Sequence, residues 1–265
     1  MIASLIRCKG EEMTIDLNSK SHAANRINWF IDRGCQLLRS EEKQRNYLGC
    51  SAVGGPCERA VQYEALSTVY CGKVIQAPEI PSRVLRVFSR GHVVEDLAAG
   101  WMRSAGFLVN TINESGRQFG VSFLDGRLLG HVDGIITFWF AKEECPVELP
   151  CLWECKCLHH KGVTGLRRNK LKNTYPKYYG QMQLYMGGLN LSRGVITCVD
   201  ADTMEIYHEI VPFSEKEFKG LLERTEHVLD VCERGEMIPR LAVSPAEIMC
   251  KLCHWKDVCW GDEND

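Results

Sequence analysis

The sequence lacks a long apolar run, a strong net charge and any internal repeat. No stretch is long and apolar enough to cross a bilayer, and the first six residues are too short and lack the cleavage site of a secretory signal. The 32 basic and 34 acidic residues leave a formal net charge of −2, so bulk charge does not indicate a nucleic-acid binder, although a local basic patch is enough to contact phosphates. We therefore expect a cytoplasmic globular protein with no membrane partner.

Cysteine, by contrast, is abundant, with 14 residues in a chain of 265. Thiols stay reduced inside cells, so disulfides are not expected and at least some of these cysteines should bind metal. Five isolated cysteines are instead interpreted as small buried hydrophobic residues: Cys8, Cys35, Cys71, Cys198 and Cys232.

The densest cysteine group lies near the C-terminus, in CKLCHWKDVCW, and comprises Cys250, Cys253 and Cys259. A tetrahedral thiolate site needs a fourth ligand. His254 offers one locally, and Cys57 or Cys50 offers one through the fold. Zinc and an iron–sulfur cluster have the same ligand spacing here, so the sequence predicts a thiolate site without choosing between them.

The spacing of apolar residues predicts an α/β fold in which helices flank a mixed sheet. Helices are predicted over residues 21–39, 57–66, 84–106, 178–188 and 214–235, the last capped by Ser214 with Glu217 three residues later. Strands are predicted over residues 107–111, 117–123, 128–140, 150–158, 194–200 and 205–211.

Residues 128–158 are predicted to form two strands joined by a turn, the first carrying Asp133 and the second carrying Glu154 and Lys156. Side chains alternate along a strand, so Glu154 and Lys156 share a face. Two carboxylates held together repel and favour a divalent cation such as Mg²⁺ or Mn²⁺. A lysine beside that cation can orient or deprotonate water and stabilise charge developing on a phosphate. An exposed ion pair is the usual meaning of Glu-x-Lys, but Trp153 and Cys155 indicate a buried strand.

Two flanking segments add to this hairpin. His92 lies one helical turn before Glu95, so His92 is interpreted as a third metal ligand that Glu95 orients. The basic segment 161–177 directly follows the second strand and is interpreted as contacting phosphates rather than as a solvated loop.

In their order, these motifs resemble the PD-(D/E)XK nucleases of the RecB-like branch, especially the CRISPR-associated Cas-four-type and related phage exonucleases. The motifs are CERAVQY, GHVVED, GHVDG, WECK, QMQLY and the C-terminal cysteines, over residues 51–260. No single motif is specific, but the ordered set is. The resemblance implies a restriction-endonuclease-like fold and a metal-dependent DNA exonuclease in recombination, repair or CRISPR adaptation, whose proteins would be partners beside DNA.

The resemblance also implies roles for individual residues. The implied catalytic residues are His92, Asp133, Glu154, Lys156 and Gln181, of which His92, Asp133 and Glu154 bind Mg²⁺ or Mn²⁺. The predicted substrate-binding residues are Arg59 and Tyr185, from the resemblance, and Arg167, Arg168 and Lys170, from the basic segment. Asp133 follows valine where the family pattern has proline, a common variation.

A four-iron, four-sulfur cluster is the cofactor that the resemblance implies, held by Cys57, Cys250, Cys253 and Cys259, with zinc as the alternative. Cys50 leaves the fourth ligand open, although CxRxxxY follows Cys57 as the pattern requires. The cluster would join the C-terminal region 241–265 to a nuclease core over 49–240, after a helical extension over 1–48.

Two other functions fit the same residues. One is a non-catalytic DNA-binding module whose metal only stabilises the fold. The other is a zinc-stapled adaptor whose acidic hairpin is only structural. The sequence does not indicate an oligomeric state.

Overall fold

The computed structural model describes residues 20–70 and 75–261. Residues 1–20 are predicted to be irregular; of these, 1–19 lie outside the described residues, as do Cys8 and Cys71, and Lys20 begins a helix. The chain divides into two compact units, Met1–Lys43 with Pro81–Arg86, and Gln44–Ile80 with Val87–Asp265. Within the described ranges, no helix is long and apolar enough to span a membrane.

The first unit contains α1 (Lys20–Glu41), which confirms the helix predicted over 21–39, and the first residues of α4 (Ser82–Ser104). Polar contacts join the two segments. The Ser82 hydroxyl donates to the Asp32 carbonyl (3.1 Å), and Arg86 forms an ion pair with the Asp32 carboxylate.

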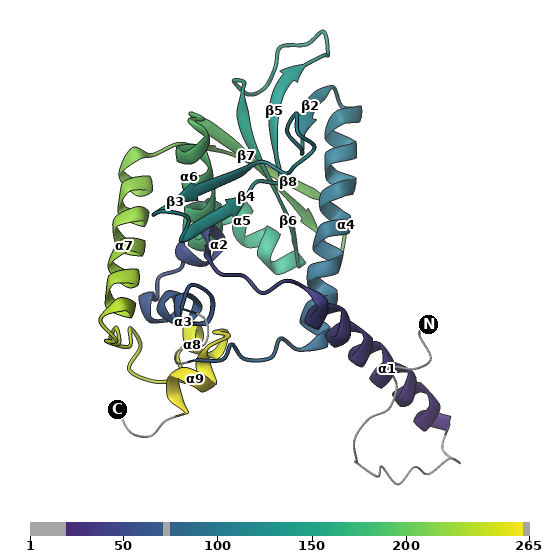
Figure 1. The fold of residues 1–265 in the computed structure, drawn as a ribbon. Helices are drawn as coiled ribbons and strands as arrows, with labels where there is room; N and C mark the ends of the chain where they lie inside the picture. Colours follow the sequence, from purple (N-terminus) through teal and green to yellow (C-terminus); the bar gives the residue numbers. More distant parts are fainter. Residues whose placement is uncertain (1–19, 71–74, 262–265) are drawn as a thin grey trace. The chain divides into compact units, whose positions relative to one another are not determined.

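The second unit is built on a five-stranded sheet in the order β2-β5-β6-β7-β8 (Figure 1). The strands are β2 (Phe107–Asn110), β5 (Gly134–Trp139), β6 (Cys151–Leu158), β7 (Arg193–Asp200) and β8 (Ile206–Pro212). Strands β6 and β7 are parallel, and the other neighbours are antiparallel. The predicted mixed sheet is confirmed. The central strand β6 is buried over its first five residues, so any charge on it lies in the interior.

The prediction of a single strand over 128–140 was wrong. Residues there form two strands in different sheets: β4 (Leu128–His131) pairs with β1 (Leu48–Gly49) and β3 (Gly120–Phe123), whereas β5 joins the five-stranded sheet. The Val132 N–H still bonds to the Phe119 carbonyl (3.0 Å), but the next residue, Asp133, uses its carboxylate to accept from Cys155 N–H (2.8 Å). The ladder with β6 therefore starts only at Gly134, and Asp133 lies at the break between strands.

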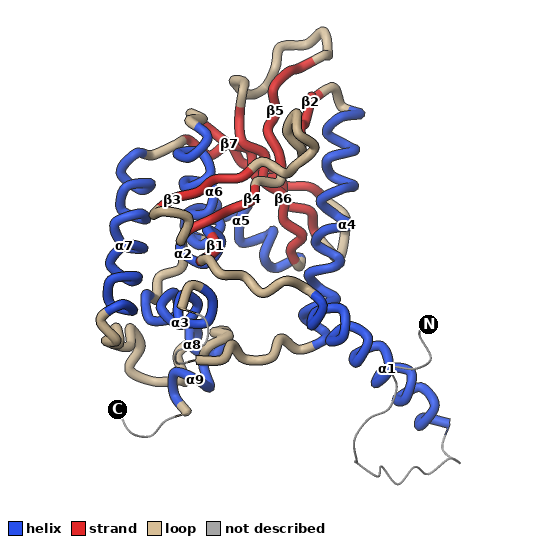
Figure 2. Tube along the Cα trace, in the orientation of Figure 1, coloured by secondary structure: helices blue, strands red, loops and turns tan. Residues whose placement is uncertain are grey.

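Helices cover both faces of the five-stranded sheet (Figures 1 and 2). On one face, Val94 and Ala98 of α4 pack against Trp153 and Cys155 of β6. The opposite face carries α5 (His160–Thr174), α6 (Pro176–Leu189), and, beyond them, α3 (Glu58–Thr68) and α7 (Glu215–Glu233). The short helices are α2 (Cys50–Val53), α8 (Ile248–Lys251) and α9 (Lys256–Trp260). The predicted helices over 57–66, 84–106, 178–188 and 214–235 are confirmed to within a few residues.

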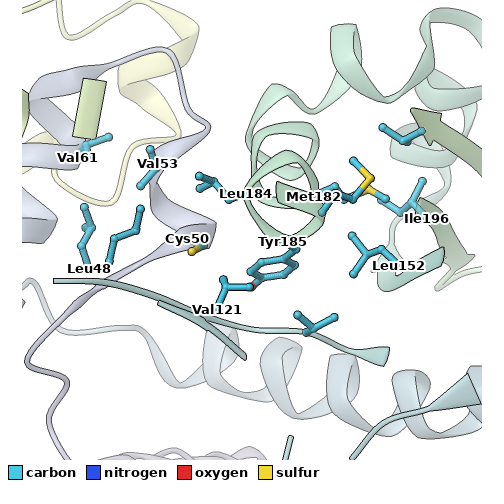
Figure 3. Packing of buried hydrophobic residues seen from close by; sticks show 14 of the residues in the cluster. Leu48, Cys50, Val53, Val61, Val121, Leu152, Met182, Leu184, Tyr185 and Ile196 are labelled. Atoms are coloured by element: carbon cyan, nitrogen blue, oxygen red, sulfur yellow. The ribbon is translucent and has the colours of Figure 1, made fainter. Parts of the chain in front are cut away.

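The larger core lies between β6, β7 and the helices of the α6 side. Figure 3 shows Leu152 and Ile196 of the sheet meeting Met182 of α6, with Tyr185 directed towards Val121 and Cys50. Of the isolated cysteines, Cys198 and Cys232 are buried, as predicted, and Cys35 is half-buried.

Candidate active site

An acidic pair and a lysine meet where β5 begins beside β6. The Lys156 ammonium lies 2.5 Å from Glu154 Oε1 and 3.7 Å from Asp133 Oδ2. Glu154 and Lys156 share a face because they are two residues apart on β6, and Asp133 reaches them because its carboxylate binds the intervening Cys155 N–H. The three residues that the hairpin pattern indicated are therefore adjacent.

Glu154 is fully buried and only half satisfied. Its Oε1 accepts from Lys156 Nζ and from Gln181 Nε2 (2.9 Å), whereas its Oε2 has no hydrogen-bond partner among the described residues. An unsatisfied buried polar atom costs about 1–3 kcal/mol, and more when it is charged. A carboxylate oxygen left open beside a second carboxylate is the donor set that suits a hard divalent cation. The residues present therefore fit a Mg²⁺ or Mn²⁺ site.

Electrostatics at this site follow from burial and from the two acids. Burial and the neighbouring Asp133 carboxylate raise the pKa of Glu154, and the Lys156 ammonium opposes that rise. Burial alone would lower the pKa of Lys156, but the Glu154 and Asp133 carboxylates outweigh it and the pKa is raised. The lysine therefore stays an ammonium beside the two acids, where it neutralises part of the acidic charge.

Helix α4 presents a further acid to the site, which the sequence reading treated only as an orienting partner. The His92 side chain is 82% exposed and its Nδ1 lies 4.0 Å from Glu95 Oε2, whereas the Glu95 side chain is 28% exposed. Burial, followed by the Asp133 carboxylate, raises the pKa of Glu95 to about 7. Glu95 lies one turn before the buried Ala99, and this i, i+4 relation to a core position is the signal that could have identified it.

Helix α6 contributes the amide that holds Glu154. Gln181 Nε2 donates both to Glu154 Oε1 and to the Tyr185 hydroxyl (3.0 Å), so Gln181 and Tyr185 lie beside the acidic pair as the motif implied. Tyr185 is only 3% exposed, and burial raises its pKa. In this arrangement Gln181 orients the Glu154 carboxylate, and Tyr185 supports Gln181 from the core.

The basic segment that follows β6 is a helix, α5, rather than a loop. Its cations Arg167, Arg168 and Lys170 are exposed, and Arg167 pairs with Glu205 (3.0 Å). The helix is interrupted at Lys170, whose φ is 65°, and the next N–H, that of Leu171, donates to the Glu209 carboxylate (3.0 Å).

Arg59, assigned to substrate binding by the resemblance, lies away from this surface. It is 8% exposed and donates to the Tyr63 hydroxyl and to the Ile238 carbonyl (3.1 Å each). The bond to Ile238 ties α3 to the segment that precedes the C-terminal cysteines.

The C-terminal cysteines share one pocket with Cys57, and the pocket is lined by Cys57, Cys250, Cys253 and Cys259 together with Tyr63, Trp255 and Arg240. Burial, together with the three neighbouring thiols, raises the pKa of Cys253. Cys50 lies elsewhere, in the core beside Gly130. Cysteine sulfur is the ligand type of structural zinc and iron–sulfur sites, so this pocket has the donors that such a cofactor uses.

Among the described residues, neither the acidic site nor the cysteine pocket forms a complete set of metal ligands. In the portion of the chain that the structure describes, no three His, Cys, Asp or Glu side chains stand in metal-binding geometry.

Comparison with known proteins gives a likeness of fold. No protein-family model and no curated protein matches the sequence. An alkaline exonuclease from Laribacter hongkongensis superposes with a TM-score of 0.50 at 14% identity, covering 72% of this chain and 90% of that one. A phage-related exonuclease from Haemophilus somnus 129PT gives 0.50 at 15% identity, covering 71% and 94%. At such identities the likeness shows a shared fold alone. Any argument about the chemistry of this protein therefore rests on the geometry of its site.

Proposed function

We propose that this protein is a metal-dependent DNA exonuclease that hydrolyses phosphodiester bonds. The observation that carries the proposal is the buried Glu154, with one oxygen unpartnered, beside Asp133 and Lys156. Burying an acid and a lysine on the central strand, beside a second acid, costs stability, and such groups are often kept where chemistry uses them.

Asp133 and Glu154 would hold the Mg²⁺ or Mn²⁺ ion, with a third ligand from α4. The sequence points to His92 for that ligand, whereas the burial of Glu95 and its proximity to Asp133 favour Glu95. The bound ion would polarise the phosphate and supply a nucleophilic water at neutral pH. Lys156 would hold that water in line and stabilise negative charge on the phosphate oxygens, and Gln181 would keep Glu154 oriented.

DNA as substrate, and attack from an end, are supported by the names of the two structures that share this fold, both of which are exonucleases. Arg168 and Lys170 of α5 would contact phosphates outside the reaction centre, because both are exposed cations on the helix that leaves the catalytic strand. We also propose that the exonuclease acts in recombination, repair or CRISPR adaptation.

The cysteine pocket would hold a four-iron, four-sulfur cluster, with zinc as the alternative. Its support is the gathering of Cys57 from the start of α3 with three cysteines from the C-terminal region. A cluster there would fasten the C-terminal region to α3, and its loss would loosen that part of the fold.

Digestion of end-labelled linear DNA and of closed circular DNA with Mn²⁺ tests the function. We expect linear DNA to be degraded and circles to resist. Lys156→Ala should abolish cleavage while DNA binding and folding persist, and Lys172→Ala, which removes a lysine paired with Glu217 on the surface, should cleave normally. DNA binding with no degradation by the wild type would instead establish a binding module. Absence of both binding and cleavage would favour a zinc-stapled adaptor.

A further inference from the structure

Tyr178 lies in the first turn of α6 and faces the catalytic lysine. Its ring centroid is 5.5 Å from Lys156 Nζ, within the range of a cation–π contact. Tyr178 is three residues before Gln181, so one face of α6 presents the ring to Lys156 and the amide to Glu154. The ring is half-buried against the larger core.

The other contacts of the ammonium come from the sheet side. Lys156 Nζ donates to Glu154 Oε1 and to the Cys155 carbonyl (2.9 Å), and lies 3.7 Å from Asp133 Oδ2. A lysine has a flexible four-carbon stem and no planar fork to fix its direction. On the side of α6, the Tyr178 ring limits where the Lys156 ammonium can lie.

The ring itself is fixed by its neighbours. Tyr175 packs against Tyr178 with ring centroids 5.2 Å apart and planes tilted by 31°. Both tyrosines pack on the buried core residues between α5, α6 and the sheet. Tyr178 is therefore a rigid surface rather than a mobile side chain.

We propose that Tyr178 is a positioning residue that holds the Lys156 ammonium in its catalytic direction through the face of its ring. The inference rests on the proposed nuclease function and deepens it, because it assigns to α6 the placement of the lysine as well as of the carboxylate. The hydroxyl is not required, since the ring face provides the contact.

Two substitutions separate the ring from the hydroxyl. Tyr178→Phe keeps the aromatic face and should cleave DNA at a kcat within about twofold of the wild type, whereas Tyr178→Leu should lose about tenfold in kcat, the weight of one desolvated cation–π contact. DNA affinity and KM should change little in both variants, because the ring acts on the lysine and not on DNA.

Tyr179→Leu is the matched control. Tyr179 makes the same type of contact with Lys172, 5.2 Å from its ring centroid, and is likewise half-buried against the larger core. This variant should keep wild-type kcat, which separates a general effect of removing a tyrosine from α6 from an effect on the catalytic lysine. Equal losses in the Tyr178→Leu and Tyr179→Leu variants, a loss in Tyr178→Phe as large as in Tyr178→Leu, or wild-type kcat in Tyr178→Leu would overturn the proposal.

A second measurement does not depend on cleavage. Acylation of lysines by a water-soluble amine reagent, followed by mass spectrometry, should label Lys156 faster in Tyr178→Leu than in Tyr178→Phe or the wild type, with other lysines unchanged. If the wild type does not cleave DNA, faster labelling of Lys156 in Tyr178→Leu would still support the contact between the ring and the lysine. That result would overturn only the nuclease function. Unchanged labelling would contradict the positioning role directly.

Discussion

Gln181 on α6 donates through one amide nitrogen to Glu154 Oε1, at 2.9 Å, and to the Tyr185 hydroxyl. The bond to Glu154 links a helix to a buried carboxylate on the central strand. The other Glu154 oxygen, Oε2, has no hydrogen-bond partner among the described residues. The orientation of the carboxylate is thus set before any ion binds.

The third metal ligand can be assigned by comparing two alanine variants. Glu95→Ala should weaken Mn²⁺ binding at least roughly tenfold, because it removes a half-buried carboxylate beside Asp133, whereas His92→Ala, which removes an exposed ring, should leave affinity within about twofold. Isothermal titration with Mn²⁺ measures both. The reverse ranking would restore His92 as the ligand indicated by the sequence motif.

Stability of the metal-free protein should depend on pH through Glu95. Burial, followed by the Asp133 carboxylate, raises the Glu95 pKa from 4.5 to about 7, so between these values the folded protein binds more protons than the unfolded chain. The stabilising contribution is complete below the lower value and is lost as pH rises through the upper one. Urea unfolding across this range should show the decline, and Glu95→Gln should flatten it. An unchanged pH slope in the glutamine variant would exclude Glu95 as its source.

Gly130 leaves room for Tyr185 and Cys50 to pack closely in the core beside the site. A Cβ at this position would lie 2.3 Å from the Tyr185 ring and 2.9 Å from the Cys50 sulfur. Gly130→Ala should therefore destabilise the protein by about 1–3 kcal/mol and displace the tyrosine that supports Gln181. Gly100→Ala is the control, since nothing lies within 4 Å of a Cβ there, and it should stabilise α4 by about 0.5–1 kcal/mol. Urea unfolding measures both, and equal effects would refute the steric argument.

If the cysteine pocket holds an iron–sulfur cluster, the protein should be coloured, and one substitution should remove the colour. Freshly purified protein should absorb in a broad band near roughly 400 nm if the thiolates hold iron and sulfide. Cys57→Ser should lose the band, because Cys57 lines the pocket, and Cys50→Ser should keep it, because Cys50 lies in the core. A colourless protein that contains zinc would select the alternative cofactor, and loss of the band in Cys50→Ser alone would reassign the fourth ligand.

Local chemistry made several elements predictable. Ser214 caps α7, its hydroxyl accepting from Glu217 N–H as the capping-box spacing indicated. Glu154 and Lys156 share a face because strand alternation is a property of the backbone. Gly106, with φ of 107°, follows the end of α4, where a left-handed residue is expected.

Contacts between distant segments were not predictable in the same way. The break between β4 and β5 depends on a bond from Cys155 N–H to the Asp133 side chain, which no local pattern encodes. His92 is exposed, whereas Glu95, three residues later on α4, is half-buried. The spacing of Glu95 from Ala99 indicates the inward face of the helix, but its proximity to Asp133 follows only from the packing of α4 on the sheet. Tyr178 was not singled out, because its partner lies on another element.

The sequence by itself determined which acidic, basic and thiol side chains are available to a site and which of them share a strand or helix face. Periodicity and capping are short-range, so they can be read from neighbouring residues. Tertiary structure decided which acid of α4 turns towards Asp133, which cysteine joins the C-terminal three, and that α6 touches both Glu154 and Lys156. These outcomes depend on burial and on distances across the fold, which are fixed only when the helices pack against the sheet.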